Sequence, residues 1–140
     1  MTRFLILIVI AFVLVSATLG WMLQAHLPGA TVADIFLGLT PGLKLLAVLI
    51  VVLTGVGVVG GLRRDVVRVR IAAIMTVAIG VMGAAYGELN THLGMIIDGP
   101  INFATMASGR IESLAILVLG LFGAFLGLGA LQLRGGVRRG

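Results

Sequence analysis

The segment RRDVVRVR, residues 63–70, lies between two long apolar runs and carries four of the ten Lys and Arg residues of the chain. The flanking runs, residues 45–62 and 71–87, are each close to the ~20 residues that cross a ~30 Å hydrocarbon core at 1.5 Å per residue. Because only this short link joins them, we expect the two runs to form neighbouring antiparallel helices in a tight hairpin.

Two further apolar runs, residues 4–23 and 114–133, flank this hairpin. The 140-residue chain is 60% hydrophobic and 11% charged, with a mean hydropathy of +1.23. Such a composition lies far outside that of soluble domains. The sequence therefore predicts an all-α, polytopic membrane protein, in which residues 1–140 form a single four-helix transmembrane bundle.

The basic residues predict how the chain is threaded. If all four runs cross the membrane, every Lys and Arg except Lys44 and Arg110 falls on one side. The positive-inside rule then places both termini and segment 63–70 in the cytoplasm, as in a multi-pass inner-membrane protein. Trp21 and Tyr86 fall near the outer ends of their runs, where aromatic rings settle at headgroup level. The arginines flank apolar runs, so we expect them to contact anionic lipid headgroups rather than nucleic acid.

The first run has one alternative interpretation. Arg3, the apolar residues 4–14 and the sequence VSA at 15–17 have the order of a secretory signal with its cleavage site. Cleavage would leave three helices and an external N-terminus. Because apolar character continues to Leu23, we favour a membrane-crossing helix.

The two outer connections, residues 24–44 and 88–113, are longer and partly apolar. In the first, TVAD at 31–34 has capping-box spacing with Asp in place of Glu, and Pro41-Gly42 follows as a stop signal. In the second, Asp98-Gly99-Pro100 predicts a turn that opens a helical piece through Ala107. We therefore expect a short interfacial helix in each outer loop.

Glycine is the second strong signal, with 21 residues in the chain. Several have the small-xxx-small spacing that lets membrane helices approach closely. Such faces serve either internal packing of the bundle or an interface with further copies or other membrane subunits. The candidate helix-packing residues are Gly57, Gly61, Gly83, Gly87, Gly120, Gly123 and Gly127.

The interiors of the four runs contain no Asp, Glu, Lys, Arg or His. Intramembrane ionisable residues usually mark proton relays and ion pathways, so a pump with its own membrane carboxylate is not expected. The interior hydroxyls of Ser16, Thr18, Thr54 and Thr76 are expected to bond back to the carbonyl four residues earlier. Thr54 and Thr76 are also the candidates for lining a pore.

Charged and polar residues collect at the predicted outer face. One interpretation is structural: Glu112 favours the positive end of its helix dipole, and Arg110 neutralises a nearby carboxylate. The functional interpretation is an external vestibule for an ion or anionic solute. Its candidate residues are Glu88, His92, Asp98, Arg110 and Glu112.

No enzymatic or cofactor site is expected. His26 and His92 are the only histidines and lie at matched depth beyond the outer boundary, where a pair of imidazoles could ligate a metal or haem. Their spacing matches no metal motif, so we expect interfacial hydrogen bonds and no metal or cofactor. The string GVGVVG at 55–60 matches a dinucleotide fingerprint but lies inside an apolar helix without a preceding strand. The chain has no cysteine, and no nucleophile–base set is recognisable.

The stretch LGLFGAFLGL, residues 119–128, resembles the glycine-rich transmembrane segment of the MotA/TolQ/ExbB proton-channel superfamily. Four helices with both ends cytoplasmic are also similar to the flagellar-stator branch, although its large cytoplasmic segment is here only residues 63–70. In that superfamily a partner subunit supplies the proton-carrying carboxylate. The resemblance thus implies that an uncharged interior, with Thr54 or Thr76 facing a pore, is compatible with conduction.

Together these features predict a non-enzymatic membrane protein. The leading hypothesis is an accessory or scaffold subunit that packs through glycine-rich helix faces against itself or larger membrane partners. The alternative is a small oligomeric ion or proton channel, or a transporter subunit. Both place the protein in the lipid bilayer as a homo-oligomer or with other membrane subunits.

Overall fold

The computed structural model describes residues 2–26, 28, 29, 31–98 and 103–136. These residues form five helices and no strand: α1 (Thr2–His26), α2 (Val32–Gly38), α3 (Pro41–Leu62), α4 (Val66–Asp98) and α5 (Phe103–Gly136). All except α2 are long and apolar enough to cross a membrane. The predicted all-helical class and its four membrane-length helices are confirmed.

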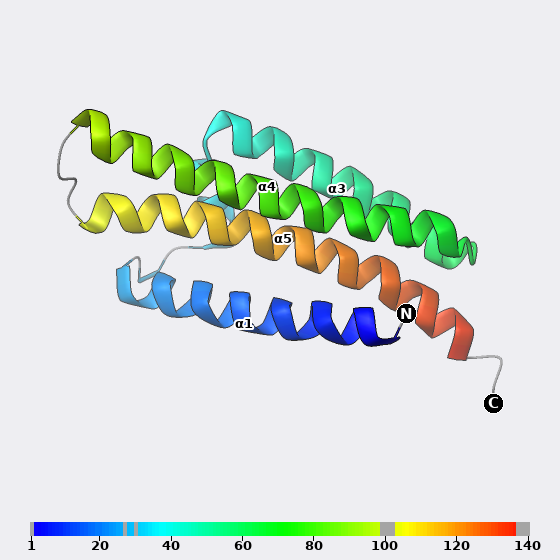
Figure 1. Cartoon of the computed structure of the whole chain (residues 1–140). Coiled ribbons are helices and arrows are strands. Elements are labelled where there is room, and N and C mark those ends of the chain that lie inside the picture. Colours follow the sequence, from blue (N-terminus) through cyan, green and yellow to red (C-terminus); the bar gives the residue numbers. More distant parts are fainter. Residues whose placement is uncertain (1, 27, 30, 99–102, 137–140) are drawn as a thin grey trace.

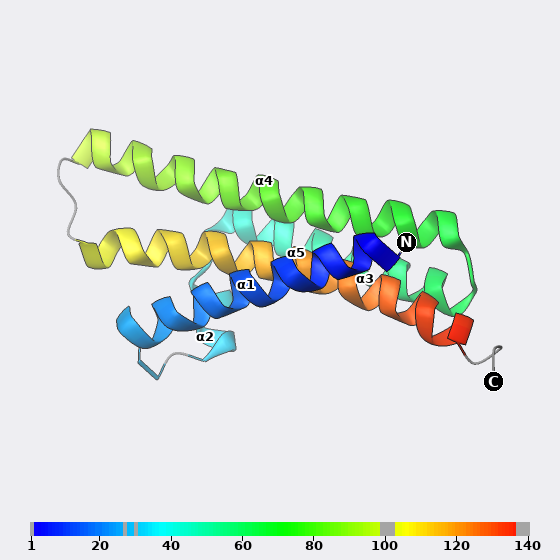
Figure 2. The ribbon, with the colours of Figure 1, turned by 60° about the horizontal axis from the view of Figure 1, so that its bottom comes forward.

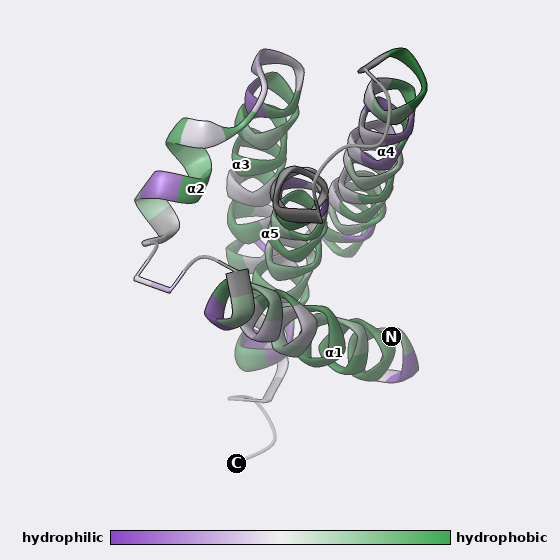
Figure 3. Ribbon diagram, turned by 90° about the vertical axis from the view of Figure 1, so that its left-hand side faces the viewer, coloured by the Kyte–Doolittle hydropathy of each residue, from purple (hydrophilic) through white to green (hydrophobic). Residues whose placement is uncertain are grey.

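Helix α5 is the centre of the fold. It packs against α3, α4 and α1, and α3 and α4 also pack against each other. Seen along the bundle, α3, α4 and α5 form a three-helix core, and α1 crosses on the far side of α5 (Figure 3). Only 6% of the most apolar window of α1 is buried, against 39% for α5. Helix α1 is therefore a peripheral span, attached to one helix of a closed core.

The first and last helices begin and end near the α3–α4 hinge. The start of α1, the hinge and the end of α5 lie together at one end of the molecule, and the end of α4, the start of α5 and α2 lie toward the other end (Figure 1, and from a second side in Figure 2). Four successive crossings of one bilayer require this arrangement.

The hinge is tighter than a generic loop because one motif ends α3 and starts α4. Arg64 N–H donates to Gly61 O (3.1 Å) and Asp65 N–H to Gly60 O (2.9 Å), the paired bonds of a Schellman cap. Arg64 has the left-handed conformation (φ 63°) that this cap requires. Asp65 Oδ1 then accepts from Arg68 N–H (3.0 Å), which caps the first turn of α4.

The first outer connection contains the short helix α2. Its capping box is complete: Asp34 N–H donates to Thr31 Oγ1, and Thr31 N–H donates to Asp34 Oδ2 (2.9 Å). Pro41, taken from the sequence as a stop signal, is the first residue of α3, with Thr40 as its N-cap. Proline suits this position because the first helical N–H has no intrahelical partner.

The second outer connection differs from the prediction. The expected loop over 88–113 is mostly helix, because α4 continues to Asp98 and α5 begins at Phe103. The predicted piece through Ala107 is thus the first part of α5 rather than a separate helix. Residues 99–102, including most of the expected Asp98-Gly99-Pro100 turn, lie outside the described residues.

The prediction failed because polar residues end the apolar run at residue 87, whereas the helix continues to Asp98. Glu88, Asn90 and Thr91 lower the hydropathy, yet no proline interrupts α4 between residues 66 and 98. At 1.5 Å per residue a helix of 33 residues is about 50 Å long, well beyond a ~30 Å hydrocarbon core. A helix of this length that crosses a bilayer has to project past the hydrocarbon core or tilt within it.

Apolar side chains fill two clusters on opposite flanks of α5. The first joins α1, α4 and α5 through buried Ile8, Val69, Ala73, Leu121, Ala124 and Leu128. The second joins the start of α3 to α5 through Leu39, Leu43, Ala47, Ile50 and Ile116. Phe12 of α1 stacks on Phe122 of α5 with ring centroids 5.8 Å apart, which anchors the peripheral helix to the core.

Candidate functional site

The α4–α5 contact is built around glycine. A Cβ placed on Gly120 would lie 2.6 Å from Thr76 O and 3.0 Å from Gly80 Cα. Both neighbours are backbone atoms, so the two helices touch main chain to main chain. A Cβ on Gly83 would likewise lie 2.9 Å from Ile116 Cγ2. Close approach of this kind is what small residues permit between membrane helices.

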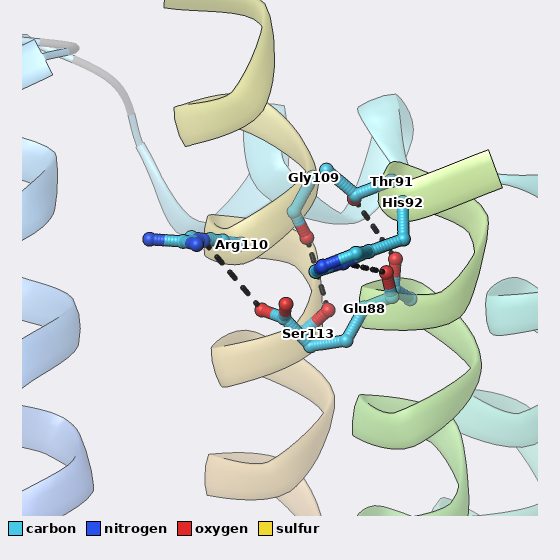
Figure 4. A network of polar contacts seen from close by, with 7 residues as sticks. Glu88, Thr91, His92, Gly109, Arg110 and Ser113 are labelled. Atoms are coloured by element: carbon cyan, nitrogen blue, oxygen red, sulfur yellow. Dashed lines mark hydrogen bonds and ion pairs between the residues drawn. The ribbon is translucent and has the colours of Figure 1, made fainter. Parts of the chain in front are cut away.

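Toward the outer end, the same interface alternates glycine with hydroxyl residues. Ser113 of α5 packs on Gly87 of α4, and Thr91 of α4 packs on Gly109 of α5. Each hydroxyl donates to the carbonyl of the glycine four residues before it, Thr91 to Gly87 O (2.9 Å) and Ser113 to Gly109 O (3.0 Å). Figure 4 shows Thr91, Gly109 and Ser113 where the two helices face each other.

The α3–α5 contact repeats this construction. Gly57 faces Gly127, with a Cβ on Gly57 placed 3.7 Å from Gly127 Cα, and a Cβ on Gly61 would lie 2.9 Å from Ala130 Cβ. Gly123 is covered by the Thr54 side chain. The seven predicted packing glycines are all buried between α3, α4 and α5. Their faces are occupied by the chain itself, so a partner would have to use another surface.

The two candidate pore residues meet in the middle of the core. Thr54 Oγ1 and Thr76 Cγ2 both contact the position of a Cβ on Gly123. Thr54 donates to Ile50 O (2.7 Å), and Thr76, which is 1% exposed, donates to Ala73 O (2.9 Å). A conducting path along these hydroxyls would need the three helices to separate.

The other two interior hydroxyls belong to α1. Thr18 Oγ1 donates to Leu14 O (2.9 Å), four residues earlier, as expected. Ser16 Oγ does not: it is buried and has no hydrogen-bond partner within the described residues. A buried hydroxyl without a partner is unfavourable. The expected bond of Ser16 to the carbonyl four residues earlier is therefore absent at a position where it would stabilise α1.

Three of the five vestibule candidates come together. Arg110 Nε lies 3.9 Å from Glu88 Oε1, with both side chains close to half exposed. His92 Nδ1 lies 3.3 Å from Glu88 O within the same helix. Figure 4 shows the Glu88 side chain extending from α4 across α5 toward Arg110. An exposed pair of this length contributes at most about 1 kcal/mol, so it positions the helix ends rather than holding the fold.

The remaining candidates are not part of this group. Glu112 is two residues from Arg110, about 200° around the helix, and its carboxyl group lies toward the backbone N–H of Thr40 at the start of α3. The side chains of Asp98 and His26 lie outside the described residues, so the predicted pairing of His26 with His92 stays a prediction. Among the described residues, no group of three or more His, Cys, Asp or Glu side chains is placed to hold a metal.

Sequence reasoning missed four residues of the α4–α5 interface: Gly80, Thr91, Gly109 and Ser113. The signal was present, because Gly87-x-x-x-Thr91 and Gly109-x-x-x-Ser113 have the same spacing as the glycine pairs. The first motif starts at the last residue of the predicted run 71–87 and continues into the region 88–113 that low hydropathy had assigned to a loop, and the second lies wholly within that region. A search for small residues at intervals of four beyond the apolar runs would have found them.

Comparison with protein-family models, with curated proteins and with solved structures gives no match for this chain. The resemblance of residues 119–128 to the MotA/TolQ/ExbB superfamily thus rests on the sequence alone.

Proposed function

We propose that this chain is a non-enzymatic inner-membrane protein, with its hinge and both termini in the cytoplasm, that acts as an accessory or scaffold subunit. The observation that carries the proposal is the position of α1. This helix packs mainly against α5 and touches α4 only through the first apolar cluster, and only 6% of its most apolar window is buried within the chain. A membrane span so little covered by its own chain offers a face to a second copy or to another membrane subunit.

The glycines that remain open indicate which face this is. Gly20 on α1 and Gly55 on α3 have no atom of another residue within 4 Å of a Cβ placed there. Gly20 lies one turn after Ser16, whose buried hydroxyl has no partner among the described residues. In lipid, small residues together with a hydroxyl are the features that associate helices. Because Ser16 Oγ is buried against the chain itself and Gly20 is open, we assign the exposed face of α1 around Gly20 to the subunit contact.

The test compares two equally open glycines. Protein purified in mild detergent is examined by native mass spectrometry for its partners and their stoichiometry. Gly20→Leu should abolish the assembly, and Gly55→Leu should leave it intact. Neither substitution meets a neighbour inside the chain, so both variants should keep the wild-type unfolding midpoint.

Two outcomes would contradict the proposal. An assembly equally sensitive to both substitutions would show that the α1 face is not the contact. Purified protein that conducts ions or protons alone in liposomes, with conduction lost in Thr54→Val, would replace the scaffold by a channel.

A further inference from the structure

Two apolar grooves open beside α4 at the hinge end of the molecule. The larger, about 280 Å³, runs between α3 and α4, and its apolar walls are Leu53, Val56, Val67, Ile71, Ala72 and Met75. Most of these side chains are exposed, so the groove opens on the lipid-facing surface rather than inside the core. Asp65 and Arg68 border the same groove.

The groove is charged at one end, beside Arg68, and apolar along the rest of its length toward Met75. From Arg68 to Met75, α4 advances about 10 Å at 1.5 Å per residue, most of one leaflet of a ~30 Å hydrocarbon core. The aliphatic stem of Arg68 packs on Gly60, since a Cβ there would lie 3.3 Å from Arg68 Cγ. This packing holds the guanidinium at the membrane-surface end of an apolar slot, as arginines at helix ends commonly lie.

The charge at this end is strongly positive. Arg63, Arg64 and Arg70 are exposed beside Arg68, and Asp65 is the one acidic residue of segment 63–70. Asp65 Oδ2 lies 3.4 Å from Arg68 Nε and so orients the guanidinium. A guanidinium has five N–H donors, and the terminal amino groups of Arg68 remain to receive an anion.

We propose that this α3–α4 groove binds one anionic phospholipid, its phosphate on Arg68 and an acyl chain along Val56, Ile71 and Met75. Charge complementarity selects this occupant: a zwitterionic lipid carries its own cation beside the phosphate, and a soluble anion would leave the apolar walls uncovered. A second, smaller groove of about 210 Å³ on the opposite flank of α4 is lined by Phe4, Arg70, Ile74 and Leu128; its described lining includes no carboxylate to orient the arginine, so the assignment is made for the α3–α4 groove alone. Val69, between the two arginines, is fully buried.

The experiment measures lipid binding to the delipidated full-length protein by native mass spectrometry. The protein is titrated with phosphatidylglycerol or phosphatidylcholine that have identical acyl chains. One phosphatidylglycerol should bind with clear preference. Arg68→Gln should weaken it about five-fold, the effect of one arginine near an anionic surface, whereas Arg134→Gln, outside the groove at the same end, should change it little.

A second pair of variants tests the groove itself. Val56→Trp fills the slot, and Val48→Trp places the same side chain on an exposed part of α3 outside the groove lining. The first should abolish selective binding and the second should retain it. Equal binding of the two lipids, equal effects of Arg68→Gln and Arg134→Gln, or selective binding that survives Val56→Trp would each overturn the assignment.

A spectroscopic measurement covers the case in which a variant folds poorly. In a Trp21→Phe background, which removes the single native tryptophan, Met75→Trp reports from the deep end of the groove. Brominated phosphatidylglycerol should quench this residue more strongly than brominated phosphatidylcholine. A Val48→Trp reporter in the same background should show no headgroup preference, and equal quenching at Met75→Trp would contradict the site. The scaffold role does not enter these readouts, so the two proposals fail independently.

Discussion

At the scale of single residues, the tightest constraint in the molecule is the missing side chain of Gly120. An added Cβ would meet Thr76 O and Gly80 Cα, both main-chain atoms held by their own helix. We expect Gly120→Ala to lower the free energy of unfolding by about 1–3 kcal/mol, the usual effect of overpacking. Thermal or SDS-induced unfolding in micelles measures this change.

Gly129→Ala is the matched control for that substitution. Gly129 lies on the same helix with nothing within 4 Å of a placed Cβ, so alanine there adds helix propensity without a clash. Its stability should be unchanged or slightly raised. Equal destabilisation by both substitutions would show that the α4–α5 backbones are not in direct contact.

The hinge stores strain at one residue. Arg64 has φ 63°, a left-handed conformation that costs a non-glycine residue roughly 1–2 kcal/mol. We therefore expect Arg64→Gly to raise the free energy of unfolding by about 1 kcal/mol. Arg63→Gly removes the same charge at φ −87° and should lower it, by roughly 0.5–1 kcal/mol. The same direction of change in both variants would mean that charge, rather than backbone conformation, decides the effect.

At the scale of elements, the stability of α2 depends on a titrating cap. Thr31 donates its hydroxyl and its backbone N–H to Asp34, and these bonds hold the pKa of Asp34 below its ordinary value of 3.8. A lowered pKa in the folded state means that the stabilisation is complete above pH 3.8 and is lost as the pH falls through the lower, folded value.

The backbone amide signals of α2 in an NMR titration follow this transition directly. They should stay constant from neutral pH to about pH 4 and then move toward unfolded positions in strongly acidic solution, while those of α3 stay fixed. Asp34→Asn has no carboxylate to be protonated and should show no such step. A step of the same size in the variant would assign the change to another group.

Helix α1 should behave as a separate element, because it packs mainly against α5, and the stack of Phe12 on Phe122 is part of that contact. Phe12→Ala is expected to weaken the attachment by about 1 kcal/mol, the usual size of an aromatic pair, and to leave the α3–α4–α5 core unchanged. The chain has no native cysteine, so spin labels on α1 and α5 can report the distance between the two helices. Its distribution should broaden in Phe12→Ala but not in Val13→Ala, which alters an exposed neighbour. Loss of the whole fold in Phe12→Ala would contradict a peripheral α1.

At the scale of the whole molecule, hydropathy and residue spacing predicted the number of long helices and one of the helix caps. Four apolar runs gave the four long helices, and the spacing in Thr31-Val32-Ala33-Asp34 gave the cap of α2. The helical parts 88–98 and 103–113 were predicted as loop because Glu88, Thr91 and Ser113 lower the local hydropathy. Thr91 and Ser113 instead pack on Gly109 and Gly87 of the facing helix, and no local pattern predicts which residues come together there.

The partners of each glycine could not be predicted for the same reason. Spacing shows that Gly123 lies on a small-residue face of its helix, but it does not show which other helix packs against that face. Only the assembled α3, α4 and α5 place Thr54 and Thr76 against it. The hydroxyls that the sequence offered as pore lining are therefore packed against the backbone of a third helix, and the glycines left open are Gly20, Gly55 and Gly129 instead.

The orientation of the whole molecule in the membrane is the last prediction, and it depends on the arginines acting together. The hinge and the end of α5 lie at one end of the bundle (Figure 1), and a bilayer with the positive charge inside places that end in the cytoplasm. Single cysteines introduced into this cysteine-free chain at Arg63 or Arg134 should react with a membrane-impermeant maleimide only after the cells are permeabilised. Leu37→Cys in α2, whose side chain is exposed, should react in intact cells.

Each of the first two variants removes one arginine from a set of eight, so the charge bias that orients the chain persists. If Arg63→Cys and Arg134→Cys react from opposite sides, the hinge and the end of α5 do not lie at the same membrane surface. The proposed lipid site at the hinge would then not face the cytoplasmic leaflet together with the other arginines.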